Sequence, residues 1–435
     1  MKIHFVGVGG IGTSALARHF KLNDHRVTGS DISESEIISD LREMGIEVTI
    51  GHEKKNVDKV VDKVIYSPAV PCDNPELREA KRLNIKTKNY PEALGELTEK
   101  YFTIGISGTH GKSTTTSMAA LVMQEAGLDP TVIVGTKLDQ FKNSNYRKGD
   151  SKYLLIEADE WQGSLLNYST DIAVLTNLEI EHLDYYEDLD HLIKTFQKYL
   201  ESIGEKGKIV VNSKDPNLKK LSFYGDMFYF SDSDSEAKKV KKYLKVPGKH
   251  NLENAMSVYR LCRVLGVDEV DILNGISKYR GSWRRFQEKT ISVFNKKQKI
   301  LLDYAHHPTE LHATLQAIEE KYFDKKVLAV YQPHQYQRSL YLKKDFVELF
   351  RNVSVDLLIT DIYSVPGREK DAIKEKINSR NMVEEAGNEN VKYISGSLKE
   401  IAEKLGKNLL DYDLIAIIGA GNIYKLEKYL KKINT

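Results

Sequence analysis

A glycine-rich turn between an apolar run and a helical pattern constrains the fold of this chain more than any other feature. Residues Gly108, Thr109, His110, Gly111, Lys112, Ser113 and Thr114 follow the apolar run 101–106 and precede a helical pattern. In a strand–turn–helix unit, backbone N–H groups at the helix N-terminus face an anion, the lysine adds positive charge, and the hydroxyl can ligate Mg²⁺. The usual phosphate loop has glycine where Ile106 stands, so a turn without a ligand is the alternative. The turn predicts a nucleoside triphosphate site.

The composition excludes several classes of protein. The 435 residues suffice for two to four domains, and 64 Lys and Arg balance 62 Asp and Glu, unlike a dedicated nucleic-acid binder. The two cysteines, Cys72 and Cys262, lack the spacing of metal or redox motifs, which favours a reducing compartment. The N-terminus lacks the features of a signal peptide, and no apolar run approaches the ~20 residues of a membrane helix. We expect a soluble cytoplasmic protein that binds neither nucleic acid nor membrane.

Strand-like runs alternate with helical patterns along the whole chain, which predicts α/β units with parallel sheets. They fall into three series, and we place the domains at 1–99, 100–288 and 289–435. The expected strands are 3–6, 27–28, 48–50 and 63–66; then 102–106, 132–134, 153–157, 172–176 and 209–211; then 300–302, 327–331, 357–360, 391–394 and 414–418. The lysine-rich segments 231–245 and 425–432 are interpreted as solvated surface.

A second glycine loop, 7–12, joins the first expected strand to a helix. Its glycines permit a tight turn and close approach of a diphosphate, and Asp31 ends the next strand, where an acid can accept hydrogen bonds from ribose hydroxyls. This pattern predicts a site for a diphosphate-containing nucleotide. A nicotinamide-dependent dehydrogenase is the alternative, but two nucleotide loops in one chain favour a reaction with two nucleotide-bearing ligands.

Further polar residues follow expected strands or begin helices. Glu157 ends a strand beside the phosphate loop, a usual place for a Mg²⁺ ligand, and His182 follows the next strand. Asn251 and Asn254 stand one helical turn apart; capping of the helix is the alternative role for Asn251. The run 303–310 follows another strand, and capping of the next helix by Thr309, with Glu310 nearby, is the alternative role for it. The spacing of Asp303 and the nearby histidines does not suit a zinc site.

Taken in order, these motifs resemble the Mur ligase family over nearly the whole chain. Their order and spacing are more specific than any single motif. The matching segments are 7–12, 29–31, 73–76 (Asp-Asn-Pro-Glu), 108–116, 157–160, 176–184, 247–254, 284–286, 303–310, 332–334 and 419–423.

The resemblance implies a three-domain α/β fold: a Rossmann-like N-terminal domain for a UDP-sugar, a central P-loop-type ATP-binding domain, and a Rossmann-like C-terminal domain. It also implies an ATP-dependent amide ligase of peptidoglycan precursor synthesis. Such an enzyme activates the carboxylate of UDP-N-acetylmuramate as an acyl phosphate and joins it to an amino acid, here expected to be L-alanine. The implied cofactors are ATP and Mg²⁺, with Mn²⁺ as an alternative metal. We expect a monomer or weak homodimer.

The resemblance also implies roles for individual residues. The expected catalytic residues are Lys112, Glu157, His182 and Arg285, and the expected metal ligands are Ser113, Glu157 and His182. Besides the loop 108–114, the expected ATP-binding residues are His250, Asn251, Asn254, Arg285 and Asp303. The expected UDP-sugar residues are Gly9, Gly10, Ile11, Gly12, Asp31 and Ser67. Tyr304, His306 and Arg338 match positions around the incoming amino acid.

The chain departs from the family pattern at several positions. Trp161 and Gln162 replace Ser-Asp on the sugar side, and Gln335 replaces an arginine that helps to hold the carboxylate of the amino acid. Arg368 is a candidate replacement for that charge, and the segment 231–246 is shorter than in relatives. The alternatives are a ligase for another amino acid or a recycled peptide, and a nucleotide-binding relative with impaired catalysis. The N-terminal glycine loop argues against a folate-type ligase.

Overall fold

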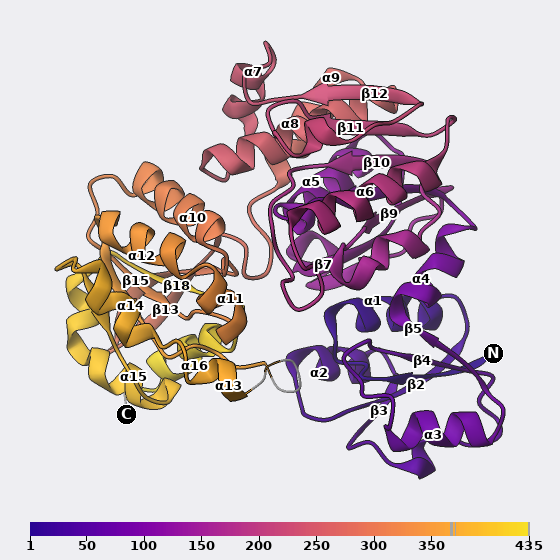
Figure 1. Ribbon diagram of the computed structural model, residues 1–435, viewed down its shortest axis with the longest axis horizontal. Coiled ribbons are helices and arrows are strands. Elements are labelled where there is room, and N and C mark those ends of the chain that lie inside the picture. The colour runs from indigo at the N-terminus through magenta and orange to yellow at the C-terminus, as the bar shows by residue number, and fades with distance from the viewer. Residues whose placement is uncertain (366–368, 370, 434–435) are drawn as a thin grey trace. The chain divides into compact units, whose positions relative to one another are not determined.

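The computed structural model describes residues 1–365, 369 and 371–433, so Arg368 lies outside the described residues. Three β-sheets, each flanked by helices, follow one another along the chain (Figure 1). The prediction of three α/β domains is confirmed. By mutual contact the chain forms two compact units. The first unit comprises Met1–Ile180, Asp188–Tyr243 and Glu253–Tyr279, and the second comprises Glu181–Glu187, Leu244–Leu252 and Arg280–Thr435.

The first sheet has five parallel strands in the order β3-β2-β1-β4-β5. This order is that of half a Rossmann fold, and its switch point lies between β1 and β4. A capping box between Asn89 and Glu92 begins α4. The elements are β1 Lys2–Val6, α1 Ile11–Leu22, β2 Arg26–Asp31, α2 Glu36–Glu43, β3 Glu47–Ile50, β4 Lys63–Tyr66, α3 Pro75–Arg82, β5 Lys86–Asn89 and α4 Tyr90–Thr98.

The second sheet, also in the first unit, has the order β12-β11-β10-β6-β9-β7-β8. All neighbours are parallel except β7 and β8. The elements are β6 Phe102–Ser107, α5 Lys112–Glu125, β7 Thr131–Leu138, β8 Ser144–Arg147, β9 Tyr153–Glu157, β10 Ile172–Leu175, α6 Leu189–Ile203, β11 Lys208–Asn212, β12 Asp226–Phe230, α7 Ala237–Tyr243, α8 Lys249–Val264 and α9 Glu269–Lys278.

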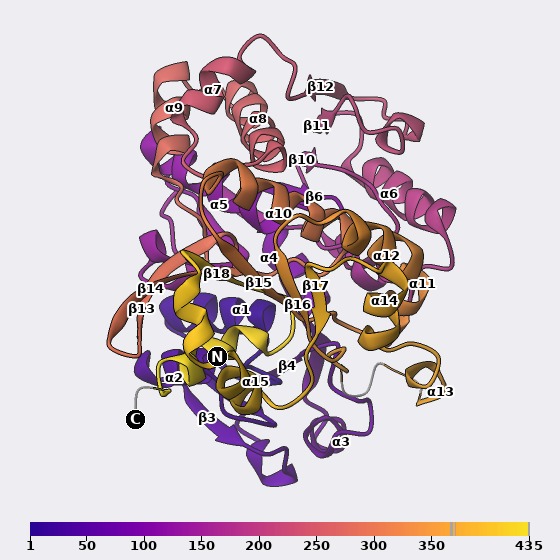
Figure 2. The ribbon, with the colours of Figure 1, turned by 90° about the vertical axis from the view of Figure 1, so that its left-hand side faces the viewer.

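The third sheet, in the second unit, has the order β13-β14-β18-β15-β16-β17, with β13 antiparallel to β14 and the other pairs parallel. Helices α10, α12 and α14 pack on one face, and α15 and α16 pack on the other (Figures 1 and 2). The elements are β13 Gln287–Val293, β14 Lys296–Asp303, α10 Pro308–Lys321, β15 Val327–Tyr331, α11 Tyr336–Tyr341, α12 Lys343–Asn352, β16 Asp356–Ile359, α13 Asp371–Lys374, α14 Ser379–Ala386, β17 Val391–Tyr393, α15 Leu398–Leu405, β18 Leu414–Ile418 and α16 Leu426–Leu430.

The parallel sheets predicted from the sequence are present, and two of them also have an antiparallel edge strand that was not predicted, β8 on β7 and β13 on β14. The hairpin of β13 and β14 turns through Phe294 and Asn295, which both have positive φ. Phenylalanine is not one of the residue types that indicate such a turn, so the hairpin could not be predicted from the sequence. The edge strands β5, β8 and β12 were also missed. Segment 237–243, by contrast, is a short helix that buries Ala237 and Val240 and leaves its lysines at the surface, as predicted.

Within the part of the chain that the structure describes, no helix combines the length and the apolar character needed to cross a lipid bilayer.

Candidate active site

The phosphate loop lies between β6 and α5 and requires glycine at two positions. Gly108 and Gly111 have φ values of +124° and +85°, which L side chains rarely adopt. A Cβ atom on Gly108 would lie 2.3 Å from the Thr176 hydroxyl, and one on Gly111 would lie 2.3 Å from the Asn254 side-chain oxygen. The loop is therefore packed tightly against two neighbouring segments and begins α5 at Lys112.

The residues after β10 hold this loop in place. Asn177 accepts a hydrogen bond from the His110 N–H at 2.8 Å through its side chain and one from the Thr109 N–H at 3.0 Å through its carbonyl. The Asn177 amide and the Thr176 hydroxyl both donate to the His110 carbonyl, at 3.1 and 2.7 Å. These four hydrogen bonds hold the backbone of the loop at Thr109 and His110. Sequence reasoning singled out this segment only for His182 and missed the role of Asn177.

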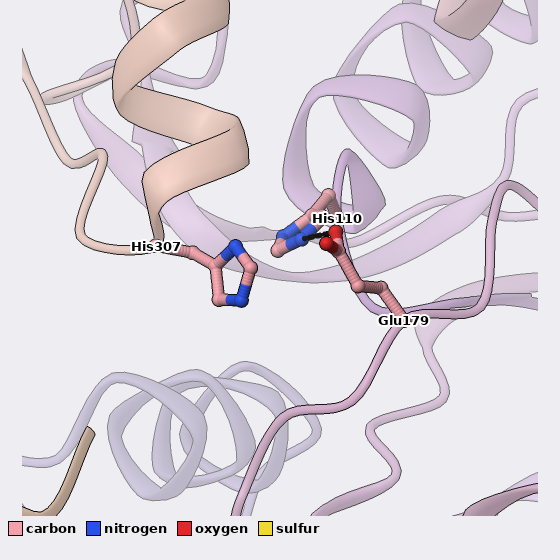
Figure 3. Close-up of side chains that lie close together, drawn as sticks. All are labelled: His110, Glu179 and His307. Atoms are coloured by element: carbon pink, nitrogen blue, oxygen red, sulfur yellow. Dashed lines mark hydrogen bonds and ion pairs between the residues drawn. The ribbon is translucent and has the colours of Figure 1, made fainter. Parts of the chain in front are cut away.

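Glu179 fixes the side chain of His110 from the same segment. The imidazole Nε2 lies 3.0 Å from a carboxylate oxygen of Glu179 (Figure 3). The Thr109 hydroxyl donates to the Glu179 carbonyl at 2.8 Å and accepts from the Glu179 N–H at 2.9 Å. Two consecutive loop residues are thus tied to one residue beyond β10.

Two carboxylates reach the start of α5 from β9, which pairs with β6 on the other side. Glu157 accepts a hydrogen bond from the Ser113 hydroxyl at 3.1 Å. Lys112 donates to both oxygens of Glu160, at 2.8 and 3.0 Å, and to the Gly108 carbonyl at 2.7 Å. Burial alone would lower the pKa of Lys112, but the charge of the fully buried Glu160 raises it above its ordinary value. Lys112 therefore stays charged, and sequence reasoning missed this use of Glu160.

The two asparagines of α8 have different surroundings. The Asn254 side-chain oxygen accepts a hydrogen bond from the Thr115 hydroxyl at 3.3 Å, so Asn254 lies beside the phosphate loop. Asn251 belongs to the second unit, where its amide donates to the Pro247 carbonyl at 2.6 Å. Because α8 begins at Lys249, Asn251 stands inside the helix and does not cap it. His250 is also in the second unit, and burial lowers its pKa to about 4.

The predicted UDP-sugar residues lie together at the switch point of the first sheet. Gly10 precedes α1, which begins at Ile11, and the Gly9 N–H donates to the Asp31 carboxylate at 2.8 Å. Ser67, just after β4, lies against Gly7: a Cβ atom on that glycine would be 3.1 Å from the Cβ of Ser67. Gly12 lies against the ring of Tyr90. The structure thus brings the two strand ends and the loop to one place.

In the second unit, Asp303 organises the end of β14. Its carboxylate accepts hydrogen bonds from the Phe286 N–H at 2.8 Å, the Ala305 N–H at 2.9 Å and the Thr314 hydroxyl at 3.1 Å. Burial raises its pKa. The guanidinium of Arg285 lies 4.9 Å from the centre of the Tyr304 ring. These contacts place Arg285, Asp303 and Tyr304 side by side.

Arg338 forms a buried ion pair with Glu181. Two of its N–H groups donate to one carboxylate oxygen of Glu181, at 2.9 and 2.8 Å, and a third donates to the His334 carbonyl at 2.9 Å. His306 lies nearby, with its Nε2 3.8 Å from Glu181, and burial lowers the pKa of His306 to about 4. A small pocket beside the pair includes Gln335 in its lining. Glu181 was not predicted as a site residue.

The N-terminus of α10 and the backbone at His182 bear on two further predictions. The N-cap of α10 is His307, whose ring accepts from the Thr309 N–H at 3.3 Å, while Glu310 completes a capping box. The alternative role of Thr309 as the cap was wrong, because Pro308 takes the first helical position and the cap is His307, two residues earlier. His182 follows Glu181 with a positive φ of +54° and belongs to the second unit. Its pairing with Glu157 on a metal ion stays a prediction.

Three family models match the chain in order. They are described as "Mur ligase family, catalytic domain" at residues 2–102, "Mur ligase middle domain" at residues 106–243, and "Mur ligase, glutamate ligase domain" at residues 284–421.

Curated relatives and solved structures agree with these matches. The UDP-N-acetylmuramate–L-alanine ligase of Acetivibrio thermocellus is 37% identical, over 99% of this chain and 95% of the relative. The enzyme of that name from Clostridium tetani is 36% identical over 98% and 96%. The solved UDP-N-acetylmuramate-alanine ligase of Thermotoga maritima has a TM-score of 0.80 and 28% identity, covering 99% of both chains. A murein peptide ligase from Psychrobacter arcticus, with a TM-score of 0.74, 20% identity and coverage of 100% and 99%, shares the fold.

Lys112 and Glu160 form a buried ion pair whose contribution to stability can be measured. Removing one partner leaves an uncompensated buried charge, which costs about 3 kcal/mol or more, whereas removing both leaves none. Lys112→Met and Glu160→Gln should each lower the Tm in calorimetry by several degrees, and the double variant should lower it by clearly less than the sum. Additive losses in the double variant would show that the two groups do not interact.

The second prediction concerns pH. Burial alone would raise the pKa of Glu181, but Arg338 holds it well below its ordinary value. A carboxylate with a depressed folded-state pKa stabilises the protein above its unfolded pKa of about 4.3, and this contribution is lost as the pH falls through the folded pKa. Glu181→Gln should therefore lower Tm at pH 7, and its difference from the wild type should shrink below about pH 4.

Scanning calorimetry from pH 3 to 7 measures this difference. Glu389→Gln, at an exposed glutamate of the same unit, is the matched control and should follow the wild type throughout. A gap between Glu181→Gln and the wild type that stays constant over the whole range would contradict the ion-pair assignment.

Proposed function

Because the chain belongs to the Mur ligase family, we propose that it joins L-alanine to UDP-N-acetylmuramate at the expense of ATP, forming an amide and releasing ADP and phosphate. The observation that carries this proposal is the phosphate loop 108–114, which includes Lys112 and Ser113, is hydrogen-bonded to Asn177 and lies beside Glu157. The comparisons support it as well, because the chain is 36–37% identical to two UDP-N-acetylmuramate–L-alanine ligases over nearly their whole lengths.

The chemistry requires two anions to meet. The sugar carboxylate attacks the γ-phosphorus of ATP and ADP leaves, which gives an acyl phosphate. The amine of the amino acid then attacks the carbonyl carbon, and the tetrahedral intermediate expels phosphate. The loop N–H groups and the ammonium of Lys112 oppose the negative charge of the phosphates as they react. Glu160 keeps that ammonium charged and fixes its direction.

The donor set beside the loop suits a hard divalent cation. The Ser113 hydroxyl and a Glu157 carboxylate oxygen lie 3.1 Å apart. Two oxygens bound at about 2.1 Å to Mg²⁺ at a right angle lie about 3 Å from each other, so one ion can take both. Bound there, Mg²⁺ would neutralise phosphate charge. We assign Ser113 and Glu157 to this ion, with His182 as a further expected ligand and Mn²⁺ as an alternative metal.

The sugar nucleotide and the amino acid have separate proposed binding sites. Gly9–Gly12, Asp31 and Ser67 form the proposed diphosphate and ribose site at the switch point of the first sheet. Tyr304, His306 and Arg338 form the proposed amino-acid site. Because Glu181 already takes two donors of Arg338 and Gln335 brings no charge, the carboxylate of the acceptor is held less strongly than a pair of arginines would hold it. This departure keeps another amino acid or a peptide as the second candidate acceptor.

Phosphate release tests the proposal directly. With Mg²⁺ and ATP present, release should require both UDP-N-acetylmuramate and L-alanine, and Lys112→Met should reduce kcat at least a hundredfold through lost electrostatic stabilisation. Each of the twenty amino acids is assayed in turn, followed by a murein tripeptide.

Each outcome of that assay identifies an activity. Release that needs the sugar and a different amino acid replaces L-alanine as the acceptor. Release with the tripeptide alone identifies a peptide-joining ligase. ATP binding without release under any condition would contradict the proposal and point to a relative with impaired catalysis.

A further inference from the structure

Glu76 is a buried carboxylate that the proposed reaction does not use. It stands in the first turn of α3, its side chain has no exposed surface, and Asn74 caps the helix by accepting from the Glu76 N–H at 2.9 Å. The segment 73–76 matched the family pattern, yet the sequence assigned no role to it. A fully buried acid costs free energy unless donors surround it, so its partners indicate what it does.

Donors from three separate segments converge on Glu76. One carboxylate oxygen lies 2.6 Å from the Ser30 hydroxyl, which donates to it, and 3.0 Å from His4 Nε2. The other accepts from the Asn56 amide at 2.7 Å and from the Glu53 N–H at 3.2 Å, with His52 Nδ1 at 3.4 Å. Burial alone would raise the pKa of Glu76, but these donors hold it below its ordinary value. The carboxylate thus joins β1, the end of β2 and the segment after β3.

Ser30 connects this carboxylate to the N-terminal glycine loop. Its carbonyl accepts hydrogen bonds from the Gly7 N–H at 2.9 Å and the Val8 N–H at 3.0 Å. The next residue, Asp31, accepts from the Gly9 N–H at 2.8 Å. Three successive loop amides are therefore fixed by two residues at the end of β2. Glu76 thus holds the Ser30 side chain from within the domain, at the same strand end whose carbonyl and carboxylate bind the loop amides.

We propose that Glu76 is a positioning residue for the diphosphate-bearing substrate, acting through Ser30 on the glycine loop. This inference rests on the proposed function for the identity of that substrate. Ser30 and Asp31 set the direction of the loop and of the acid expected to contact ribose. The Ser30 hydroxyl donates to the Glu76 carboxylate at 2.6 Å and lies 3.0 Å from His52 Nδ1, which is itself 3.4 Å from the other Glu76 oxygen. Among the residues that the structure describes, the side-chain partners of Glu76 all lie in the segment 4–56 and none in the phosphate loop 108–114, so we expect its effect on one substrate only.

Steady-state kinetics with each substrate varied separately test this role. Glu76→Gln and Ser30→Ala should raise the KM for UDP-N-acetylmuramate about tenfold or more, since small displacements of binding groups are costly, while the KM for ATP changes by less than about twofold. Glu79→Gln removes a carboxylate from the same helix, where its partners are Arg82 and Lys54, and it should leave both KM values unchanged.

The outcomes separate positioning from general stability. If Glu76→Gln raises both KM values together, or raises neither, the inference is overturned, and Tm measured on every variant shows whether folding is the cause. Calorimetric titration with UDP provides a readout that does not need turnover. If the wild type binds UDP but forms no amide, the proposed function fails while the tenfold loss of UDP affinity in Glu76→Gln still supports positioning. Failure of the wild type to bind UDP overturns the inference.

Discussion

The hydrogen bonds between Asn177 and the loop at 108–111 are the contact on which the candidate site depends. β6 carries the loop and lies between β9 and β10 in a parallel sheet, so the carboxyl ends of all three strands meet at one edge. β10 delivers the groups that hold the loop, and β9 delivers Glu157 and Glu160 to Lys112 and Ser113. The parallel register therefore assembles both halves of the phosphate site.

The N-terminal domain uses the same principle with different groups. There the loop follows β1, and the neighbouring strand β2 supplies the Ser30 carbonyl and the Asp31 carboxylate to its amides. In both loops a neighbouring strand end holds the backbone before any ligand arrives, which reduces the ordering that binding requires. The N-terminal loop has no lysine among residues 7–12, whereas the central loop has Lys112. This difference fits a diphosphate that is only bound and a triphosphate that reacts.

Much of this organisation could be predicted because it is local. Strands 63–66, 153–157, 327–331 and 414–418 have the predicted bounds, since each is a short apolar run bounded by polar residues. Lys112, Ser113 and Asp31 were identified from glycine spacing alone. The ion pairs Lys112–Glu160 and Arg338–Glu181 could not be predicted. Their partners are far apart in the sequence, and one sequence alone does not indicate which distant residues come into contact. The β13–β14 hairpin escaped for a different reason: Phe294 adopts a backbone conformation that its residue type does not signal.

In the proposed reaction, ATP activates a carboxylate before the amine attacks. Synthesis with UDP-N-acetylmuramate labelled with ¹⁸O in its carboxylate, followed by mass spectrometry of the released phosphate, tests it most directly. Each released phosphate should contain one ¹⁸O atom, because the carboxylate oxygen that attacks the γ-phosphorus leaves with it when the amide forms. Unlabelled phosphate accompanying amide formation would show that the carboxylate is never phosphorylated and would contradict the account.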